Sequence, residues 1–123
     1  MNLGWLDVCL RVESVSRSRA FYEDLGFKRA EGSDEEGWAV VVNQEARLGL
    51  FEPKFMGDER VILNFRGGDV MDNASQLQAK GHSFLEGPSR TDDGGASATL
   101  IDHDGHRLFM DTGAGETKKL PPQ

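Results

Sequence analysis

Residues 5–27, with the sequence WLDVCLRVESVSRSRAFYEDLGF, decide the fold of the chain. Within them, residues 5–12 place alternate apolar side chains on one side, which predicts a half-buried strand. The spacing then changes to that of a helix, which Ser14 or Ser16 can cap at its start and Gly26 can follow at its end. The apolar residues of this helix are expected on one stripe: Val15, Phe21, Tyr22 and Leu25.

The second half of the chain repeats this order of elements. After the first helix, strands are expected at 27–30, 38–42 and 47–51. The second half is expected to begin with a strand at 60–66 and a helix from Asp69 to Gly81. Three further strands are then expected at 82–85, 97–101 and 107–111. Matching residues of the two halves lie 55 positions apart, namely Leu10 and Phe65, Val15 and Val70, and Gly26 and Gly81. An internal repeat fixes the architecture, so the sequence predicts an α+β fold of two tandem βαβββ modules.

The length of 123 residues suits a single domain. We expect module one at about 3–53, a linker at 54–58, module two at about 59–113, and a flexible tail at 114–123.

Composition and charge exclude several classes of protein. The net charge of −7 and the absence of a Lys/Arg cluster argue against nucleic-acid binding. No apolar run reaches the ~18–20 residues of a membrane span, and the N-terminus has no secretory signal pattern. Cys9 is the only cysteine, which excludes an intrachain disulfide, favours a reducing compartment and predicts a cytoplasmic protein.

Three segments carry a family resemblance: LRVESVSRSRAFYEDLGF at 10–27, RLGLFE at 47–52 and ATLIDHDGHRLFM at 98–110. In this order they resemble the vicinal oxygen chelate superfamily, which includes glyoxalases, bleomycin resistance proteins and dioxygenases. His103 stands where the family usually has Pro, and His106 where it usually has Asn. The resemblance covers about residues 3–113. It implies a curled, eight-stranded mixed sheet with a U-shaped cleft, and a homodimer as the expected assembly.

The resemblance also gives the positions of metal ligands, which the family's metal enzymes carry on the first, fourth, fifth and eighth strands. Those positions are Asp7, Gly49, Ile62 and Phe109, and only Asp7 has a donor atom. Because a stable site needs about three or four N, O or S ligands, we expect no metal and no other cofactor here. The motif DHDGH at 102–106 offers further donors, but its residues are more typical of a tight turn.

The alternation also predicts which side chains face the cleft, since residues i and i+2 of a strand share a face. The predicted ligand-binding residues are Trp5, Asp7, Trp38, Phe51, Arg60, Asn64, Arg107 and Phe109. Their large aromatic rings are typical of an apolar ligand pocket. Counting all predicted cleft positions, five arginines face two aspartates, a balance of about +3 that suits a carboxylate or phosphate.

Three functions remain open from the sequence. The first is a metal-independent protein, similar to the bleomycin resistance proteins, that binds a small aromatic or anionic molecule. The second is a lyase or isomerase of the glyoxalase type, with a non-standard metal site or with Asp7 as the catalytic base. The third is a module whose cleft is filled by another protein.

Overall fold

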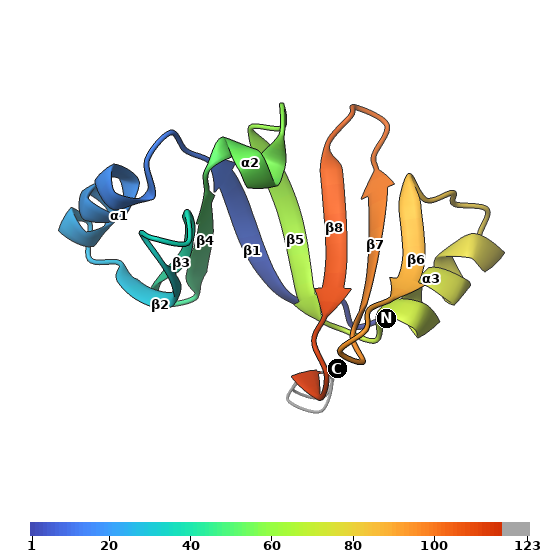
Figure 1. Cartoon of the computed structure of the whole chain (residues 1–123). Coiled ribbons are helices and arrows are strands. Elements are labelled where there is room, and N and C mark those ends of the chain that lie inside the picture. Colours follow the sequence, from blue (N-terminus) through green and yellow to red (C-terminus); the bar gives the residue numbers. More distant parts are fainter. Residues whose placement is uncertain (117–123) are drawn as a thin grey trace. The chain divides into compact units, whose positions relative to one another are not determined.

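The order strand, helix and three strands occurs twice in the computed structural model, which describes residues 1–116 (Figure 1). The first set is β1 (Gly4–Arg11), α1 (Val15–Asp24), β2 (Lys28–Ser33), β3 (Trp38–Asn43) and β4 (Ala46–Phe51). The short helix α2 (Pro53–Met56) follows. The second set is β5 (Val61–Gly67), α3 (Val70–Ala79), β6 (Glu86–Arg90), β7 (Ala96–Ile101) and β8 (Arg107–Thr112).

The strands form an eight-stranded mixed sheet in the order β2-β3-β4-β1-β5-β8-β7-β6. β1 pairs with β4 in parallel, whereas β2, β3 and β4 pair antiparallel in sequence, as do β6, β7 and β8. Each half therefore orders its strands in the same way, and the predicted α+β fold of two βαβββ modules is confirmed.

The chain forms two compact units. The first, which we call the N-terminal unit, is Asp7–Ile62. The second, the C-terminal unit, combines Met1–Leu6 with the chain from Leu63 onward. β1 thus contributes its first residues to one unit and its remainder to the other.

The core of the N-terminal unit lies between α1 and one face of β3 and β4. Val15 of α1 is completely buried, as are Ala39, Val41 and Leu50 on the strands. Ala39 pairs with Leu50 across the β3–β4 ladder, so both side chains point to the same face. In the C-terminal unit α3 packs on β7 in the same manner, with Val70, Ala96, Ala98 and Met110 buried together.

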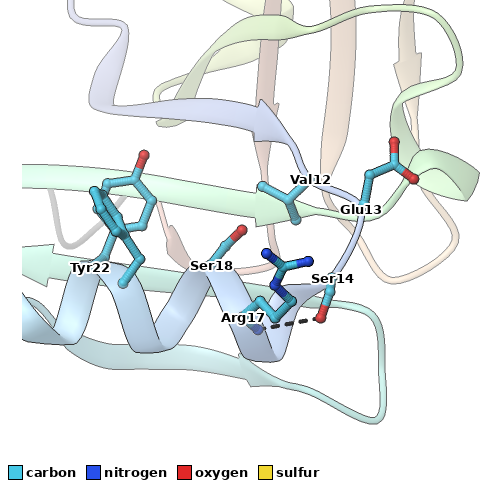
Figure 2. Close-up of a pocket in the computed structure, with 7 residues that line it drawn as sticks. Val12, Glu13, Ser14, Arg17, Ser18 and Tyr22 are labelled. Carbon is cyan, nitrogen blue, oxygen red and sulfur yellow. Dashed lines mark hydrogen bonds between the residues drawn. The ribbon is translucent and has the colours of Figure 1, made fainter.

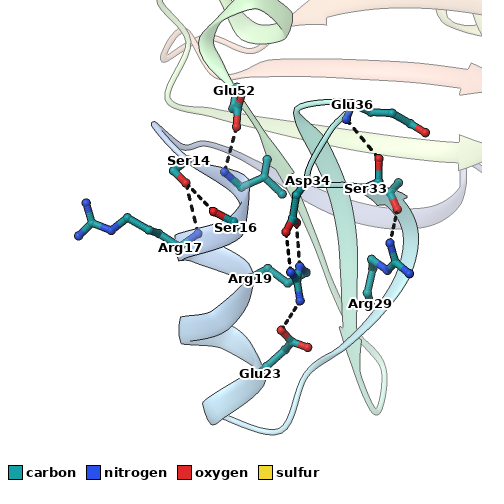
Figure 3. A network of polar contacts seen from close by, with 12 residues as sticks. Ser14, Ser16, Arg17, Arg19, Glu23, Arg29, Ser33, Asp34, Glu36 and Glu52 are labelled. Atoms are coloured by element: carbon teal, nitrogen blue, oxygen red, sulfur yellow. Dashed lines mark hydrogen bonds and ion pairs between the residues drawn. The ribbon is translucent and has the colours of Figure 1, made fainter.

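Polar contacts fix α1 to the strands that it covers (Figure 3). Ser14 is the cap, because its Oγ accepts a hydrogen bond from the backbone N–H of Arg17 at 3.3 Å. The N–H of Val15 donates to the Glu52 carboxylate at 3.1 Å. Further along the helix, Arg19 binds Asp34 with two hydrogen bonds of 2.9 and 2.6 Å, and this ion pair holds the pKa of Asp34 below its ordinary value.

The expected apolar stripe of α1 is partly wrong. Val15 is buried, but Phe21 and Leu25 are 60% and 57% exposed. At about 100° per residue, Tyr22 returns to the side of Val15, whereas Phe21 and Leu25 point roughly 80–120° away from it. The buried stripe is therefore narrower than the sequence pattern suggested, and two large apolar side chains remain on the surface.

Two expected strands differ from the structure by more than one residue at an end, whereas the others agree within one residue. The strand predicted at 82–85 lies instead at Glu86–Arg90, where it pairs with β7 across an irregular register. Its sequence, EGPSR, has no apolar alternation to reveal it. β2 continues to Ser33 through a bulge, so residues beyond the strand expected at 27–30 extend the ladder with β3. The segment expected as a linker includes most of α2, whose Met56 is buried.

The predicted tail at 114–123 lies for the most part outside the described residues. Within residues 1–116, Glu116 makes a 3.5 Å ion pair with Arg66. No helix of this described part has the length and apolar character to span a membrane.

Candidate functional site

One face of β1, β3 and β4 in the N-terminal unit carries chemically distinctive side chains. It is the face opposite to the one that α1 covers. We call it the Asp7 face, and its residues are Asp7, Cys9, Arg11, Trp38, Val40, Val42, Arg47, Gly49 and Phe51. The strand register and the contacts below agree with the sides that the alternation predicted for these residues.

Asp7 lies at the centre of a charged network on this face. The carboxylate is 1% exposed, and Arg47 holds both of its oxygens: Nε donates to Oδ1, and Nη2 donates to Oδ2 at 3.4 Å. Nη2 also lies 3.3 Å from the Glu31 carboxylate, which is 38% exposed. Burial of Asp7 is therefore accompanied by direct compensation of its charge, as buried carboxylates require.

Gly49 lies next to this network and has no side chain, but the space above it is filled. A Cβ atom at this position would stand 2.6 Å from the Phe51 ring and 3.1 Å from Cys9 Sγ. Cys9 is buried and its thiol packs here as a small apolar group, as expected from the sequence.

Aromatic rings continue the Asp7 face toward α2. Trp38 and Phe51 pair across the β3–β4 ladder and stack with centroids 5.8 Å apart and planes 8° apart. Phe55 of α2 meets Phe51 edge to face at 5.8 Å, and Lys54 lies 5.1 Å from the Phe55 ring centre. Trp38 and Phe51 are half-buried and Phe55 is 47% exposed, so the cluster offers apolar surface to a ligand.

Arg11 borders the aromatic rings from β1, because it pairs with Phe51 in the β1–β4 register. Its Nη1 lies 3.5 Å from Glu13, a carboxylate that is 83% exposed. Its buried Nε has no hydrogen-bond partner among residues 1–116.

The predicted ligand-binding residues are divided between the two units. Asp7, Trp38, Phe51 and the exposed Arg60 belong to the N-terminal unit, whereas Trp5, Asn64, Arg107 and Phe109 belong to the other. In the C-terminal unit the buried Asn64 amide donates to the backbone oxygen of Phe109 at 3.1 Å and to Asp111 at 2.8 Å. Trp5 is 39% exposed.

The expected positive balance of the cleft is reduced by pairing. Arg11, Arg47 and Arg66 each lie beside at least one carboxylate of their own unit. Three of these acids, Glu13, Glu31 and Glu116, were not among the predicted site residues. Glu31 falls beyond the strand expected at 27–30, and Phe55 falls in the expected linker at 54–58, so neither could be assigned to this face from alternation alone.

The family model described as the Glyoxalase/Bleomycin resistance protein/Dioxygenase superfamily matches residues 4–109. The chain belongs to this superfamily. The two βαβββ modules and the strand order are in agreement with that assignment. No curated protein matches the chain.

Solved structures share the fold at low sequence identity. NAD-dependent benzaldehyde dehydrogenase from Legionella pneumophila has a TM-score of 0.72 at 24% identity and covers 88% of this chain and 98% of its own. A superfamily member from Vibrio splendidus 12B01 scores 0.63 at 13% identity, covering 88% and 97%. Methylmalonyl-CoA epimerase from Mycobacterium tuberculosis scores 0.63 at 16% identity, covering 94% and 90%. At these identities the likeness shows the fold alone.

The metal-ligand positions of the superfamily do not suit a metal ion in this chain. Gly49, Ile62 and Phe109 have no donor atoms, and both oxygens of Asp7 accept from Arg47. Gly49 is in addition covered by the Phe51 ring. No group of three or more His, Cys, Asp or Glu side chains within residues 1–116 is placed to hold a metal. These donors do not form a divalent-metal site.

The DHDGH motif forms a tight turn between β7 and β8, as predicted. Asp102 accepts hydrogen bonds from the backbone N–H groups of Asp104 and His106, both at 2.9 Å, and lies 2.8 Å from His106 Nδ1. Gly105 has a φ of 90°. The turn is exposed, and the Asp102 carboxylate holds its backbone and the His106 ring.

We expect the stability contributed by the Asp102 charge to depend on pH. The His106 backbone N–H, and then its side chain, hold the pKa of Asp102 below its ordinary value of 3.8. A lowered pKa adds stability above 3.8 that is lost as the pH falls through the folded-state pKa. Thermal unfolding of Asp102→Asn should therefore show a lower Tm than the parent at pH 7, with the difference shrinking below about pH 4. Asp104→Asn is the control, and an equal loss in both variants would contradict the assignment.

Proposed function

We propose that the protein binds a small aromatic molecule, neutral or anionic, on the Asp7 face without a metal ion. The observation that carries this proposal is the occupation of the superfamily's ligand positions by the protein itself. The Arg47 guanidinium lies on the Asp7 carboxylate, and the Phe51 ring lies over Gly49. A cation and a ring supplied by the chain thus occupy the surroundings of Asp7 and Gly49, two of the four positions that the family resemblance gives for metal ligands.

The aromatic cluster supports the type of ligand. Trp38, Phe51 and Phe55 keep apolar surface accessible beside charged groups, which is the usual composition of a small-molecule site. A planar ligand gains from stacking on such rings, by about 0.5–1.5 kcal/mol beyond area burial. Arg11 at the border of the cluster can donate hydrogen bonds to a carboxylate, so anionic aromatic molecules fall within the proposed range.

The alternative of a lyase or isomerase with Asp7 as the base has less support. A general base needs an oxygen within hydrogen-bond reach of the substrate proton. Asp7 is buried and both oxygens are held by Arg47. The homodimer and the cytoplasmic location remain predictions.

Thermal shift and tryptophan fluorescence test the proposal. We expect 1-naphthoate and 2-naphthol to raise the Tm and quench fluorescence, and cyclohexanecarboxylate, which has no planar ring, to do neither. Trp38→Leu should abolish the naphthyl effect, whereas Trp5→Leu, which removes the other tryptophan, should preserve the rise in Tm. Addition of Zn²⁺, Ni²⁺ or Mn²⁺, or of EDTA, should leave the Tm and the naphthyl response unchanged.

Two outcomes argue against the proposal. A response to naphthyl compounds that survives Trp38→Leu would place the binding elsewhere. A naphthyl response that appears only with an added divalent ion would show that the function depends on a metal.

A further inference from the structure

We propose a second binding site, for a small arylalkyl carboxylate, in a hollow of about 300 Å³ beside the first turns of α1 (Figure 2). The hollow is separate from the Asp7 face, and the inference does not depend on the function proposed for that face. Its lining residues are Val12, Glu13, Ser14, Arg17, Ser18, Phe21 and Tyr22.

Arg17 supplies the positive charge of this hollow. Among residues 1–116 its guanidinium forms no ion pair or hydrogen bond, and only its backbone N–H is engaged, by Ser14. Arg19 on the same helix differs, because Glu23 and Asp34 both hold it. A guanidinium without an acidic partner is free to bind a carboxylate in a bidentate manner.

Two hydroxyl groups add hydrogen-bonding capacity. In Figure 2 the side chains of Ser18 and Tyr22 point to the same side of α1, one turn apart. Neither hydroxyl has a hydrogen-bond partner within the described part of the chain. Each can donate to a ligand oxygen, so the hollow offers hydrogen-bond donors in addition to the Arg17 guanidinium.

Phe21 provides the apolar end of the site. The ring is 60% exposed and meets Tyr22 edge to face at 5.2 Å, which holds it in place. Tyr22 in turn meets Phe27 at 5.5 Å. Arg17 and Phe21 are four residues apart, so they lie on one side of the helix with a rise of about 6 Å between them. A carboxylate joined to a phenyl ring by a short alkyl chain matches this separation.

Glu13 restricts the charge of the ligand. Its carboxylate is 83% exposed, lines the hollow, and lies 3.5 Å from Arg11. With one unpaired guanidinium and one nearby acid, a monocarboxylate is favoured over a phosphate or dicarboxylate, whose second charge would be repelled.

Titration with 3-phenylpropionate, followed by backbone amide NMR, tests the site. We expect saturable shifts at residues 12–22 with a dissociation constant of roughly millimolar magnitude, as is usual for a small ligand on an open site. Propionate lacks the ring and 2-phenylethanol lacks the charge, so each should bind at least about tenfold more weakly.

Variants of two residues on α1, compared with variants elsewhere in the chain, distinguish binding in this hollow from non-specific binding. Arg17→Gln should weaken 3-phenylpropionate binding about tenfold or more, because a charge-assisted hydrogen bond is lost. Phe21→Ala should weaken it similarly. Arg90→Gln, which removes an exposed arginine from β6, should have no effect. Trp38→Leu, which removes the naphthyl response of the Asp7 face, should also leave 3-phenylpropionate binding unchanged.

The result that overturns the proposal is equally specific. Unsaturated or absent shifts at residues 12–22 up to about 10 mM ligand would exclude the site. Saturable shifts that Arg17→Gln and Phe21→Ala leave at parental affinity would exclude these residues as its determinants. Loss of the response in Trp38→Leu alone would assign the binding to the Asp7 face instead.

Discussion

Replacing Arg47 with methionine is expected to destabilise the protein by about 3 kcal/mol, because removing one partner of a buried ion pair leaves the other charge poorly compensated. Asp7 is 1% exposed, and Arg47 contacts both of its oxygens. Urea unfolding at neutral pH, followed by circular dichroism, measures the change as a lower midpoint with an unchanged slope.

A double-mutant cycle identifies the cause of this effect. Asp7→Asn combined with Arg47→Met should be less destabilised than the sum of the two single variants, since the charge that Arg47 compensates is then absent. Arg29→Met is the matched control, because Arg29 is exposed on β2 and within residues 1–116 its side chain donates only to the Gly32 backbone oxygen, at 3.0 Å. Additive effects at Asp7 and Arg47 would show that their contact contributes little.

Replacing Gly49 with histidine, a residue type that the superfamily's metal enzymes use as a ligand, should cost about 2 kcal/mol through overpacking. The new Cβ alone would lie 2.6 Å from the Phe51 ring and 3.1 Å from Cys9 Sγ. Thermal and urea unfolding measure the loss. We also expect the variant to bind Ni²⁺ no better than the parent, because one histidine beside an engaged Asp7 is not a sufficient ligand set.

Relief of the clash is the informative control for this prediction. Gly49→His combined with Phe51→Ala should be less destabilised than the sum of the two single variants, because the ring that occupies the space is gone. Gly49→Ala should be intermediate in cost. If the double variant is no more stable than the sum of its single changes, the Phe51 ring is not what excludes a side chain at this position.

The fold could be predicted because the two-residue alternation of a strand is followed by the spacing of a helix, and this order occurs twice in the sequence. Alternation in β1 and helical spacing in α1 recur in β5 and α3. The cap of α1 is Ser14, one of the two serines that the sequence allowed, and the cap of α3 is Asp69, where that helix was expected to begin. β6 was misplaced because its ladder depends on backbone pairing with β7, and its side chains have no apolar pattern. The exposure of Phe21 was missed because the spacing of apolar residues does not show how the helix is rotated about its axis on the sheet.

The sequence predicted which residues lie on the Asp7 face, but it did not predict which of them contact one another. Alternation assigned Asp7, Arg47 and Trp38 to one side, which the contacts on the Asp7 face bear out. The ion pair between Asp7 and Arg47 depends on the register of β1 against β4, and nothing in a single sequence fixes that register. Glu31 and Phe55 joined the face through a bulged strand and a short helix that have no periodicity to reveal them.

The two outer strands of the sheet have a consequence for association between molecules. β2 and β6 are the edges, and both have irregular registers against their neighbours. β2 also carries Lys28 and Arg29, and β6 contains Pro88, which has no N–H to donate. Charges, bulges and proline are the means by which proteins protect free strand edges from adding further strands. We therefore expect copies of this chain to associate through side-chain surfaces and to resist growth into extended intermolecular sheets.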